Sequence, residues 1–142
     1  MKIFLDTSSL LKLYHYEQGT EMLDKLFDDF AVSKVYLSEI AKVEFDSAIW
    51  KKVRTGELIQ EEARSLIDSF ELDYNKYNFI QLDSEIVNNA RNLISKHGTK
   101  GLRTLDSIQL SSALKVKSEL SLFVTADDLL RHLAETENLY VK

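Results

Sequence analysis

Short apolar runs that favour β-strands alternate with longer segments of helical periodicity along the whole chain. The strand-like runs lie at residues 2–5, 34–37, 77–82, 121–124 and 139–141. The segments between them predict helices at roughly 8–29 (two helices), 38–54, 57–74, 84–97, 104–118 and 127–135. Strands that alternate with helices are typical of a mostly parallel sheet covered on both faces. The sequence therefore predicts an α/β fold.

Length and composition indicate one ordinary globular domain that spans residues 1–142. A chain of 142 residues can bury a continuous core, and 44% apolar with 29% charged residues is a usual balance. The sequence has no proline and only four glycines, so we expect no linker within it. Gly56 and Gly98 lie where predicted helices should end.

The absence of cysteine excludes a disulfide framework, a thiolate nucleophile and a cysteine-based zinc site, and it suits the reducing cytoplasm. No apolar stretch approaches the roughly 18 residues of a membrane span, and the N-terminal pattern is not that of a signal peptide. We therefore expect a cytoplasmic protein without membrane contact. A net charge of −5 argues against a protein that coats nucleic acid, but not against an enzyme whose acids bind cations.

Asp6 ends the first apolar run, directly before Thr7, Ser8 and Ser9. A helix cap would explain an aspartate at this position. Parallel sheets, however, place their functional sites beyond the carboxyl ends of the strands, where the strand order reverses. Asp6 is therefore a candidate site residue, with the helix cap as the alternative.

Glu44 lies within the predicted helix 38–54, on a face that it shares with small and apolar residues such as Ala41 and Ala48. A glutamate turned toward a core is costly unless it is paired or binds a metal. The alternative is an edge position whose side chain reaches water. Asp46 lies elsewhere on the helix, and we expect it to be solvated.

Asp106 falls in the first turn of the predicted helix 104–118, for which Thr104 can serve as the cap. An acid in the first turn is favourable for the helix dipole, which is a sufficient structural explanation. Asp106 nevertheless shares its face with Leu110 and Ala113, and an acid needed only for the dipole has no reason to face inward.

Asp127 and Asp128 follow the run 121–124 and repeat the pattern of Asp6. Thr125 and Asp128 have the spacing of a capping box, with Asp in place of the usual Glu or Gln. Asp127 comes directly off the strand end, and would face Asp6 if the two strands are adjacent. We therefore assign Asp127 to the site and Asp128 to the cap.

Four carboxylates at one edge of a sheet would repel one another and raise their pKa values unless cations neutralise them. Oxygen ligands without histidine or cysteine favour Mg²⁺ or Mn²⁺ over zinc. Such ions activate water and stabilise charge on a transferring phosphate. The pattern therefore indicates phosphodiester hydrolysis, with Asp6, Glu44, Asp106 and Asp127 as the catalytic and metal-binding residues.

Four short motifs in order resemble those of the PIN-domain nucleases, specifically the VapC-type toxins of toxin–antitoxin pairs. They are FLDTSSLLKLY, LSEIAKVEFDSAIWKK, LRTLDSIQLSSAL and LFVTADDLL. Their acids Asp6, Glu44, Asp106 and Asp127 match the metal-binding acids of the family. Ser8 and Thr125 match hydroxyl residues that support the first and fourth acids.

The resemblance implies a three-layer α/β/α sandwich around a mostly parallel five-stranded sheet of order 3-2-1-4-5. It further implies a Mg²⁺- or Mn²⁺-dependent endoribonuclease acting on single-stranded RNA, a homodimer, and a cognate antitoxin protein as partner. Ser107 and Gln109 stand where the family commonly has Ala and His. We expect Gln109 to affect substrate handling more than metal binding.

The segment 10–27 carries more apolar side chains than two short helices need against one sheet. These are Leu10, Leu13, Tyr14, Met22, Leu23, Leu26 and Phe27. We expect part of this surface to bind a second copy or the antitoxin. The alternative is that all of it belongs to the core of the domain.

Two other functions share part of the pattern. Haloacid-dehalogenase-type phosphatases also end their first strand in an aspartate, but they carry an acid two residues later, where this chain has Ser8. Without that acid the phospho-aspartate mechanism lacks its general acid. The other alternative is a non-catalytic PIN interaction module, which would have no need of four buried like charges.

Overall fold

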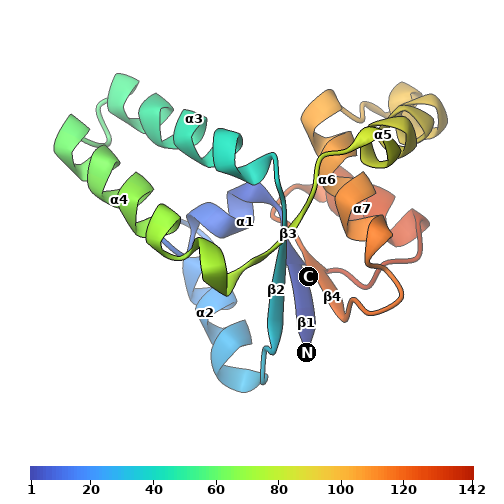
Figure 1. Ribbon diagram of the computed structural model, residues 1–142, viewed down its shortest axis with the longest axis horizontal. Coiled ribbons are helices and arrows are strands. Elements are labelled where there is room, and N and C mark those ends of the chain that lie inside the picture. Colours follow the sequence, from blue (N-terminus) through green and yellow to red (C-terminus); the bar gives the residue numbers. More distant parts are fainter.

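The computed structural model describes all residues 1–142 and contains one sheet of four parallel strands. These are β1 (Lys2–Leu5), β2 (Lys34–Ser38), β3 (Asn78–Ile80) and β4 (Leu122–Val124). Their order across the sheet is β3-β2-β1-β4, and every neighbouring pair is parallel. The order 3-2-1-4 and the parallel pairing are therefore confirmed (Figure 1).

The fifth strand, predicted at residues 139–141, is not a strand of the sheet. Val141 forms an isolated parallel bridge with Phe123 of β4, and the Phe123 N–H donates to the Tyr140 carbonyl at 2.8 Å. The segment thus lies in the expected place beside β4. Only Leu139 is buried there, while Tyr140 is 79% exposed. Few packing contacts are therefore available to extend the pairing with β4 into a full strand.

Seven α-helices surround the sheet. They are α1 (Thr7–Leu11), α2 (Thr20–Asp29), α3 (Ala41–Arg54), α4 (Gln60–Leu72), α5 (Ser84–His97), α6 (Thr104–Lys115) and α7 (Asp128–Thr136). Two short 3-10 helices, η1 (Tyr74–Lys76) and η2 (Gly98–Lys100), follow α4 and α5. Gly56 follows the end of α3 at a φ of 83°, and Gly98 caps α5, as predicted. None of the helices is both long and apolar enough to cross a bilayer.

The helices form one layer on each face of the sheet. Helices α1 to α4 cover one face and α5 to α7 the other, so the predicted α/β/α sandwich is confirmed (Figure 1). Alternate residues of β1 point to opposite faces: Ile3 and Leu5 enter the core under α1 to α4, and Phe4 enters the core under α5 to α7. Burial on both faces explains why this strand is apolar at three successive positions.

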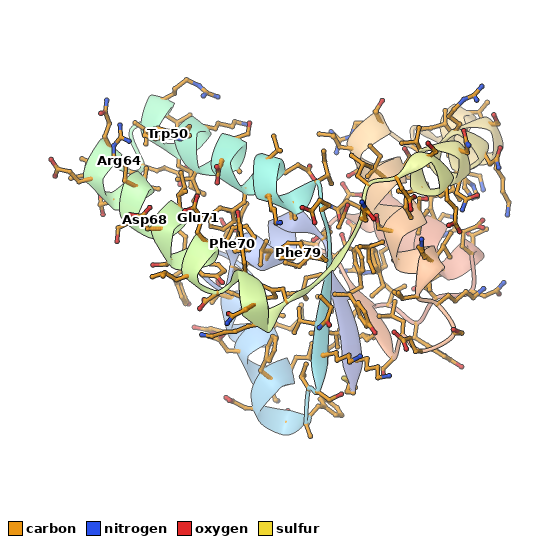
Figure 2. The ribbon with its side chains drawn as sticks, viewed as in Figure 1. Trp50, Arg64, Asp68, Phe70, Glu71 and Phe79 are labelled. Atoms are coloured by element: carbon orange, nitrogen blue, oxygen red, sulfur yellow. The ribbon has the colours of Figure 1, made fainter.

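Helices α3 and α4 pair side by side and extend beyond the sheet (Figures 1 and 2). The rings of Phe45 and Phe70 pack in a tilted arrangement at 4.4 Å between centroids, and Arg64 lies over the Trp50 ring. This pairing corrects the prediction for Asp46, which is half-buried and not solvated. Burial, and then the nearby Glu71, raise the pKa of Asp46 because α4 packs over it.

Most of the apolar side chains in segment 10–27 belong to the core. Leu10, Leu23 and Leu26 are buried, and Leu13, Tyr14 and Phe27 pack against the same cluster. Met22 is the exposed member of the set, at 48%. The alternative interpretation therefore accounts for all of these side chains except Met22, since two helices and a loop fold the others onto the sheet.

Candidate functional site

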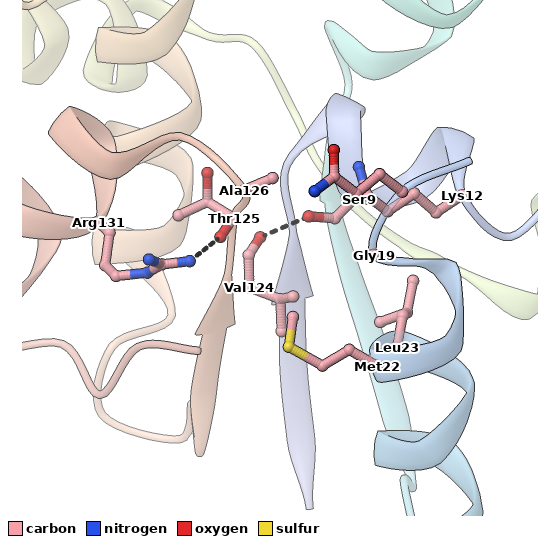
Figure 3. A pocket seen from close by; sticks show the side chains of 10 residues that line it. Ser9, Lys12, Gly19, Met22, Leu23, Val124, Thr125, Ala126 and Arg131 are labelled. Carbon is pink, nitrogen blue, oxygen red and sulfur yellow. Dashed lines mark hydrogen bonds between the residues drawn. The ribbon is translucent and has the colours of Figure 1, made fainter.

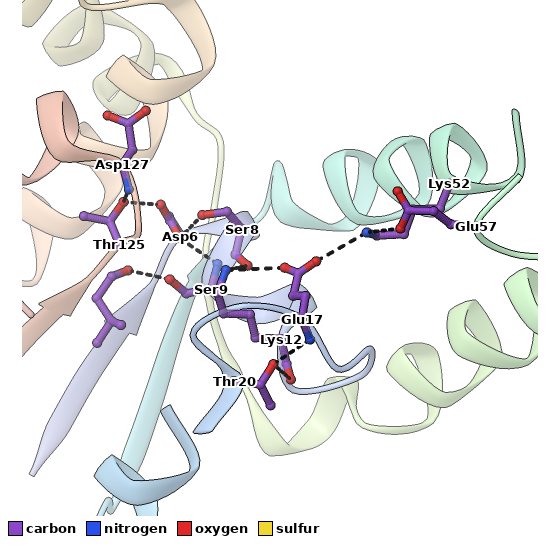
Figure 4. A network of polar contacts seen from close by, with 11 residues as sticks. Asp6, Ser8, Ser9, Lys12, Glu17, Thr20, Lys52, Glu57, Thr125 and Asp127 are labelled. Carbon is purple, nitrogen blue, oxygen red and sulfur yellow. Dashed lines mark hydrogen bonds and ion pairs between the residues drawn. The ribbon is translucent and has the colours of Figure 1, made fainter. Parts of the chain in front are cut away.

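Asp6 is both a helix cap and an inward-facing acid. It joins β1 to α1, and its Oδ1 accepts hydrogen bonds from the Ser9 N–H and the Ser8 hydroxyl, each at 2.9 Å. Its Oδ2 accepts from the Thr125 hydroxyl at 2.5 Å (Figure 4). The residue is only 5% exposed, and both supporting hydroxyls predicted from the sequence are in contact with it.

Glu44 lies in the first turn of α3 and is half-buried. Its Oε1 accepts from the Thr7 hydroxyl at 3.0 Å and from the Gln109 amide nitrogen at 2.8 Å, while Oε2 has no hydrogen bond within the chain. Burial raises the pKa of Glu44, the two hydrogen bonds oppose the rise, and the charges of Asp106 and Asp6 add to it. Glu44 is therefore near enough to Asp106 and Asp6 for their charges to act on it.

Gln109 and Thr7 hold Glu44. Through the resemblance the sequence analysis expected Gln109 to affect substrate handling, but it did not pair Gln109 with Glu44, and it did not single out Thr7. Gln109 is 2% exposed, and its amide nitrogen donates to the Thr7 hydroxyl at 2.9 Å as well as to Glu44. Its Oε1 is buried without a partner. The signal in the sequence was a polar residue about one helical turn after Asp106, on the inward face of the helix.

Asp106 lies in the first turn of α6 and is half-buried. Burial raises its pKa, the Arg103 guanidinium opposes the rise, and the charges of Asp127 and Asp6 add to it. The predicted cap is wrong: Thr104 is the first residue of the helix, and Arg103 precedes it without a side-chain cap. The Thr104 carbonyl instead accepts from the Ser107 hydroxyl at 2.6 Å.

Asp127, not Asp128, caps α7. The Asp127 Oδ1 accepts from the Leu130 N–H at 2.7 Å, while Asp128 is 96% exposed and pairs with Arg131. The predicted capping box does not form: the Thr125 hydroxyl accepts from the Asp127 N–H, its own N–H donates to the Lys142 carbonyl, and α7 begins only at Asp128. The other oxygen of Asp127, Oδ2, lies 3.8 Å from Arg103, so Asp127 also borders the acids.

The four acids thus lie near one another at the carboxyl edge of β1 and β4. They do not surround a common point at which a metal ion could bind. No group of three or more Asp, Glu, His or Cys side chains stands close enough to enclose a metal ion in this arrangement. The donor chemistry nevertheless fits a hard cation, because every candidate ligand is a carboxylate oxygen. Glu44 Oε2 and Asp106 Oδ1 have no partner within the chain, which leaves them available as ligands.

Two hollows flank this edge of the sheet. One, of about 370 Å³, is lined by Glu44, Arg103, Thr104, Leu105 and Asp106, and therefore contains two of the acids. The other, of about 420 Å³, lies between α2 and α7. Along it the Ser9 hydroxyl donates to the Val124 carbonyl and Arg131 donates to the Thr125 carbonyl (Figure 3). None of the four acids lines this second hollow, so the first is the candidate active site.

The basic residues that follow Glu44 on α3 are partly engaged in ion pairs. Lys52 bridges Glu17 and Glu57, each at 3.3 Å, and Lys12 contacts Glu17 at the same distance (Figure 4). These pairs tie the loop after α1 to the far end of α3. Among the four candidate acids, Asp106 and Asp127 pair with a cation, and that cation is Arg103.

A family model described as PIN domain matches residues 3–136. Among curated protein sequences, none matches the chain. Solved structures match over nearly the full length. FitAcB from Neisseria gonorrhoeae superposes at a TM-score of 0.69 with 18% identity, over 98% of this chain and 95% of that one.

Two further structures show the same fold. VapBC2 from Rickettsia felis, bound to a DNA fragment from its promoter, gives a TM-score of 0.66 with 16% identity, covering 100% of this chain and 98% of that one. VapC20 from Mycobacterium tuberculosis, described as a sarcin-ricin loop cleaving toxin, gives 0.66 with 14% identity, covering 89% of this chain and 92% of that one.

Proposed function

The chain belongs to the PIN domain family, and from this membership we propose that it is a metal-dependent endoribonuclease that cleaves single-stranded or loop RNA. The observation that carries the proposal is the set of four acids at one sheet edge. Burial raises the pKa of both Glu44 and Asp106, the charges of Asp106 and Asp6 add to the rise at Glu44, and those of Asp127 and Asp6 add to the rise at Asp106. A fold with no use for cations would gain stability by replacing such acids with apolar residues.

Asp6, Glu44 and Asp106 would hold Mg²⁺ or Mn²⁺, with Asp127 in direct or water-mediated contact. A bound divalent ion supplies a more acidic water and stabilises negative charge on the phosphate. The chain itself orients the ligands: Ser8 and Thr125 fix Asp6, and Thr7 and Gln109 fix Glu44. Fixed ligands lower the cost of assembling the site around an ion.

We further propose that the protein is the toxin of a toxin–antitoxin pair, acts in the cytoplasm, and is held inactive by a small antitoxin. The support is the fold shared with FitAcB, with VapBC2, which is described as bound to a DNA fragment from its promoter, and with VapC20, which is described as a toxin. A homodimer is part of this proposal. It rests on the family resemblance alone, because most apolar side chains of segment 10–27 belong to the core of the domain. An adjacent reading frame whose product neutralises the protein would support the pair most directly.

Cleavage of a fluorescent single-stranded RNA tests the enzymatic proposal. We expect cleavage that EDTA abolishes and that Mn²⁺ or Mg²⁺ restores. Asp106→Asn should remove the activity while its thermal melt stays cooperative. Cleavage by purified Asp106→Asn at the wild-type rate, with no trace of wild-type protein, would show that the site is wrongly assigned.

One observation favours a second candidate, the non-catalytic interaction module: no three of the acids are gathered around a common point. Calorimetry distinguishes the two, since a module without metal would give no heat with Mn²⁺. The phosphatase alternative has no comparable support. Ser8 occupies the position of the required second acid, and its hydroxyl donates to Asp6.

A further inference from the structure

Arg103 is the cationic side chain that contacts the acids. Its guanidinium lies 3.1 Å from Asp106 Oδ2 and 3.8 Å from Asp127 Oδ2, so one side chain bridges two of the four acids. Neither Asp6 nor Glu44 pairs with a cation; neutral hydroxyl, amide and backbone N–H groups hold them. The positive charge that the chain itself brings to this edge is thus concentrated in one residue.

The contact with Arg103 is easily broken. The Arg103 side chain is 76% exposed, and its partners Asp106 and Asp127 are 26% and 39% exposed. Ion pairs of this kind contribute little to stability, because water solvates both partners well when they separate. Arg103 can therefore leave the two aspartates without unfolding α6.

Arg103 and a divalent ion would compete for the same two carboxylates. Asp106 Oδ2 and Asp127 Oδ2 are the atoms that face the guanidinium, and both residues belong to the proposed ligand set. An ion at these carboxylates would also repel the guanidinium. Arg103 lines the hollow together with Glu44, Thr104, Leu105 and Asp106, so the displaced side chain stays at its mouth.

We propose that Arg103 binds a phosphate of the RNA strand. Without a divalent ion its side chain pairs with Asp106 and Asp127, and once an ion binds these two aspartates the side chain contacts the substrate. This inference rests on the proposed function of the site. A guanidinium suits the task because its planar fork binds a phosphate through two parallel hydrogen bonds. It also places positive charge at the site itself, in a chain whose net charge of −5 otherwise disfavours an RNA strand.

The proposal predicts that one variant binds Mn²⁺ more tightly and RNA more weakly than the wild type. Arg103→Ala should bind Mn²⁺ alone about threefold more tightly by calorimetry, since the competing exposed ion pair is gone. At saturating Mn²⁺ the same variant should bind a labelled single-stranded RNA at least about tenfold more weakly, because a charge-assisted contact is lost. Stopped-flow anisotropy reads this binding before turnover.

Two further variants serve as controls. Arg103→Lys keeps the charge but not the fork, so its affinity for RNA should lie between those of wild type and Arg103→Ala. Arg54→Ala removes the same charge from the exposed end of α3, where Arg54 forms no ion pair, and should change neither binding constant. An equal loss of RNA affinity in Arg54→Ala would show that only net charge matters and would overturn the proposal.

Unchanged or weaker Mn²⁺ binding by Arg103→Ala would also overturn it, since Arg103 would then be no competitor of the ion. A failure of the wild type to cleave RNA would contradict the proposed function only. The two binding measurements do not depend on turnover, so they still decide the role of Arg103.

Discussion

The carboxyl ends of β1 and β4 carry the same local pattern, a buried strand followed by an aspartate and a helix, yet the two aspartates differ. Asp6 is 5% exposed, and both its oxygens accept hydrogen bonds from neighbouring side chains or backbone. The Asp127 side chain is 39% exposed; one oxygen caps α7 and the other faces Arg103. Asp6, at the end of β1, is thus the fixed end of the site. Asp127, at the end of β4, lies at the border of the site, and one of its oxygens is held only by an exposed ion pair.

Thr125 connects the two ends and explains the difference. Its hydroxyl donates to Asp6 and accepts from the Asp127 N–H at 3.1 Å. The Thr125 hydroxyl thus accepts from the Asp127 N–H and not from the first turn of α7, which begins at Asp128, so Asp127 takes the cap. A strand-end acid becomes central when the neighbouring strand supplies it with a donor.

The largest effect is expected at the fixed end. Asp6→Asn keeps an oxygen to cap α1 but removes the charge from the centre of the acids. RNA cleavage should become undetectable, while the melting temperature should change little because Asn is a good cap. Wild-type cleavage by this variant would remove the distinction between the two strand ends.

The link between the ends should give the next largest effect. Thr125→Val leaves Asp6 Oδ2 and the Asp127 N–H without their partner, at a cost of about 1–3 kcal/mol in the free energy of unfolding. Turnover should fall because Asp6 loses its support, and Thr125→Ser should restore both properties. Urea unfolding and the RNA assay measure them. A Val variant as stable and active as wild type would show that the two ends act independently.

Two variants of Asp127 should distinguish the effect of its charge on turnover from the effect of its cap on stability. Asp127→Asn keeps a capping oxygen and should cut turnover about tenfold without loss of stability. Asp127→Ala should show the same loss of turnover and also lose about 1 kcal/mol of stability, because the Leu130 N–H is left unbonded. Equal melting temperatures for the Asn and Ala variants would contradict the cap assignment.

The smallest effect is expected at Asp128, which is 96% exposed and contacts only Arg131. Asp128→Ala should change the free energy of unfolding by less than about 1 kcal/mol and leave turnover intact. The same RNA assay and melts used for Asp127 give the comparison. A greater loss of turnover in Asp128→Ala than in Asp127→Ala would reverse the assignment of these neighbours.

The α/β class could be predicted from local patterns, whereas the three layers and the strand order came from the family resemblance. Residues 2–5 read as a strand whose end is a candidate position for a site, and the helix that contains Glu44 showed an inward carboxylate. Both predictions needed only sequence spacing of two to four residues.

The errors arose from contacts between distant segments. Thr125 donates to Asp6, 119 residues away, and no local pattern shows this. Asp46 is half-buried because α4 packs over it, whereas periodicity along its own helix predicted exposure. Gln109 donates to Glu44 across 65 residues, so this contact could not be predicted from the helix alone.

The claim that the four acids bind a divalent ion is tested most directly by thermal melts of wild type and Asp106→Asn with increasing Mn²⁺. A ligand that binds only the folded state raises its stability with concentration. We predict a rise in melting temperature for wild type that Asp106→Asn lacks, with no corresponding difference in EDTA beyond a small gain for the variant from relieved repulsion. Equal Mn²⁺-dependent shifts in the two proteins, or none in either, would contradict the account.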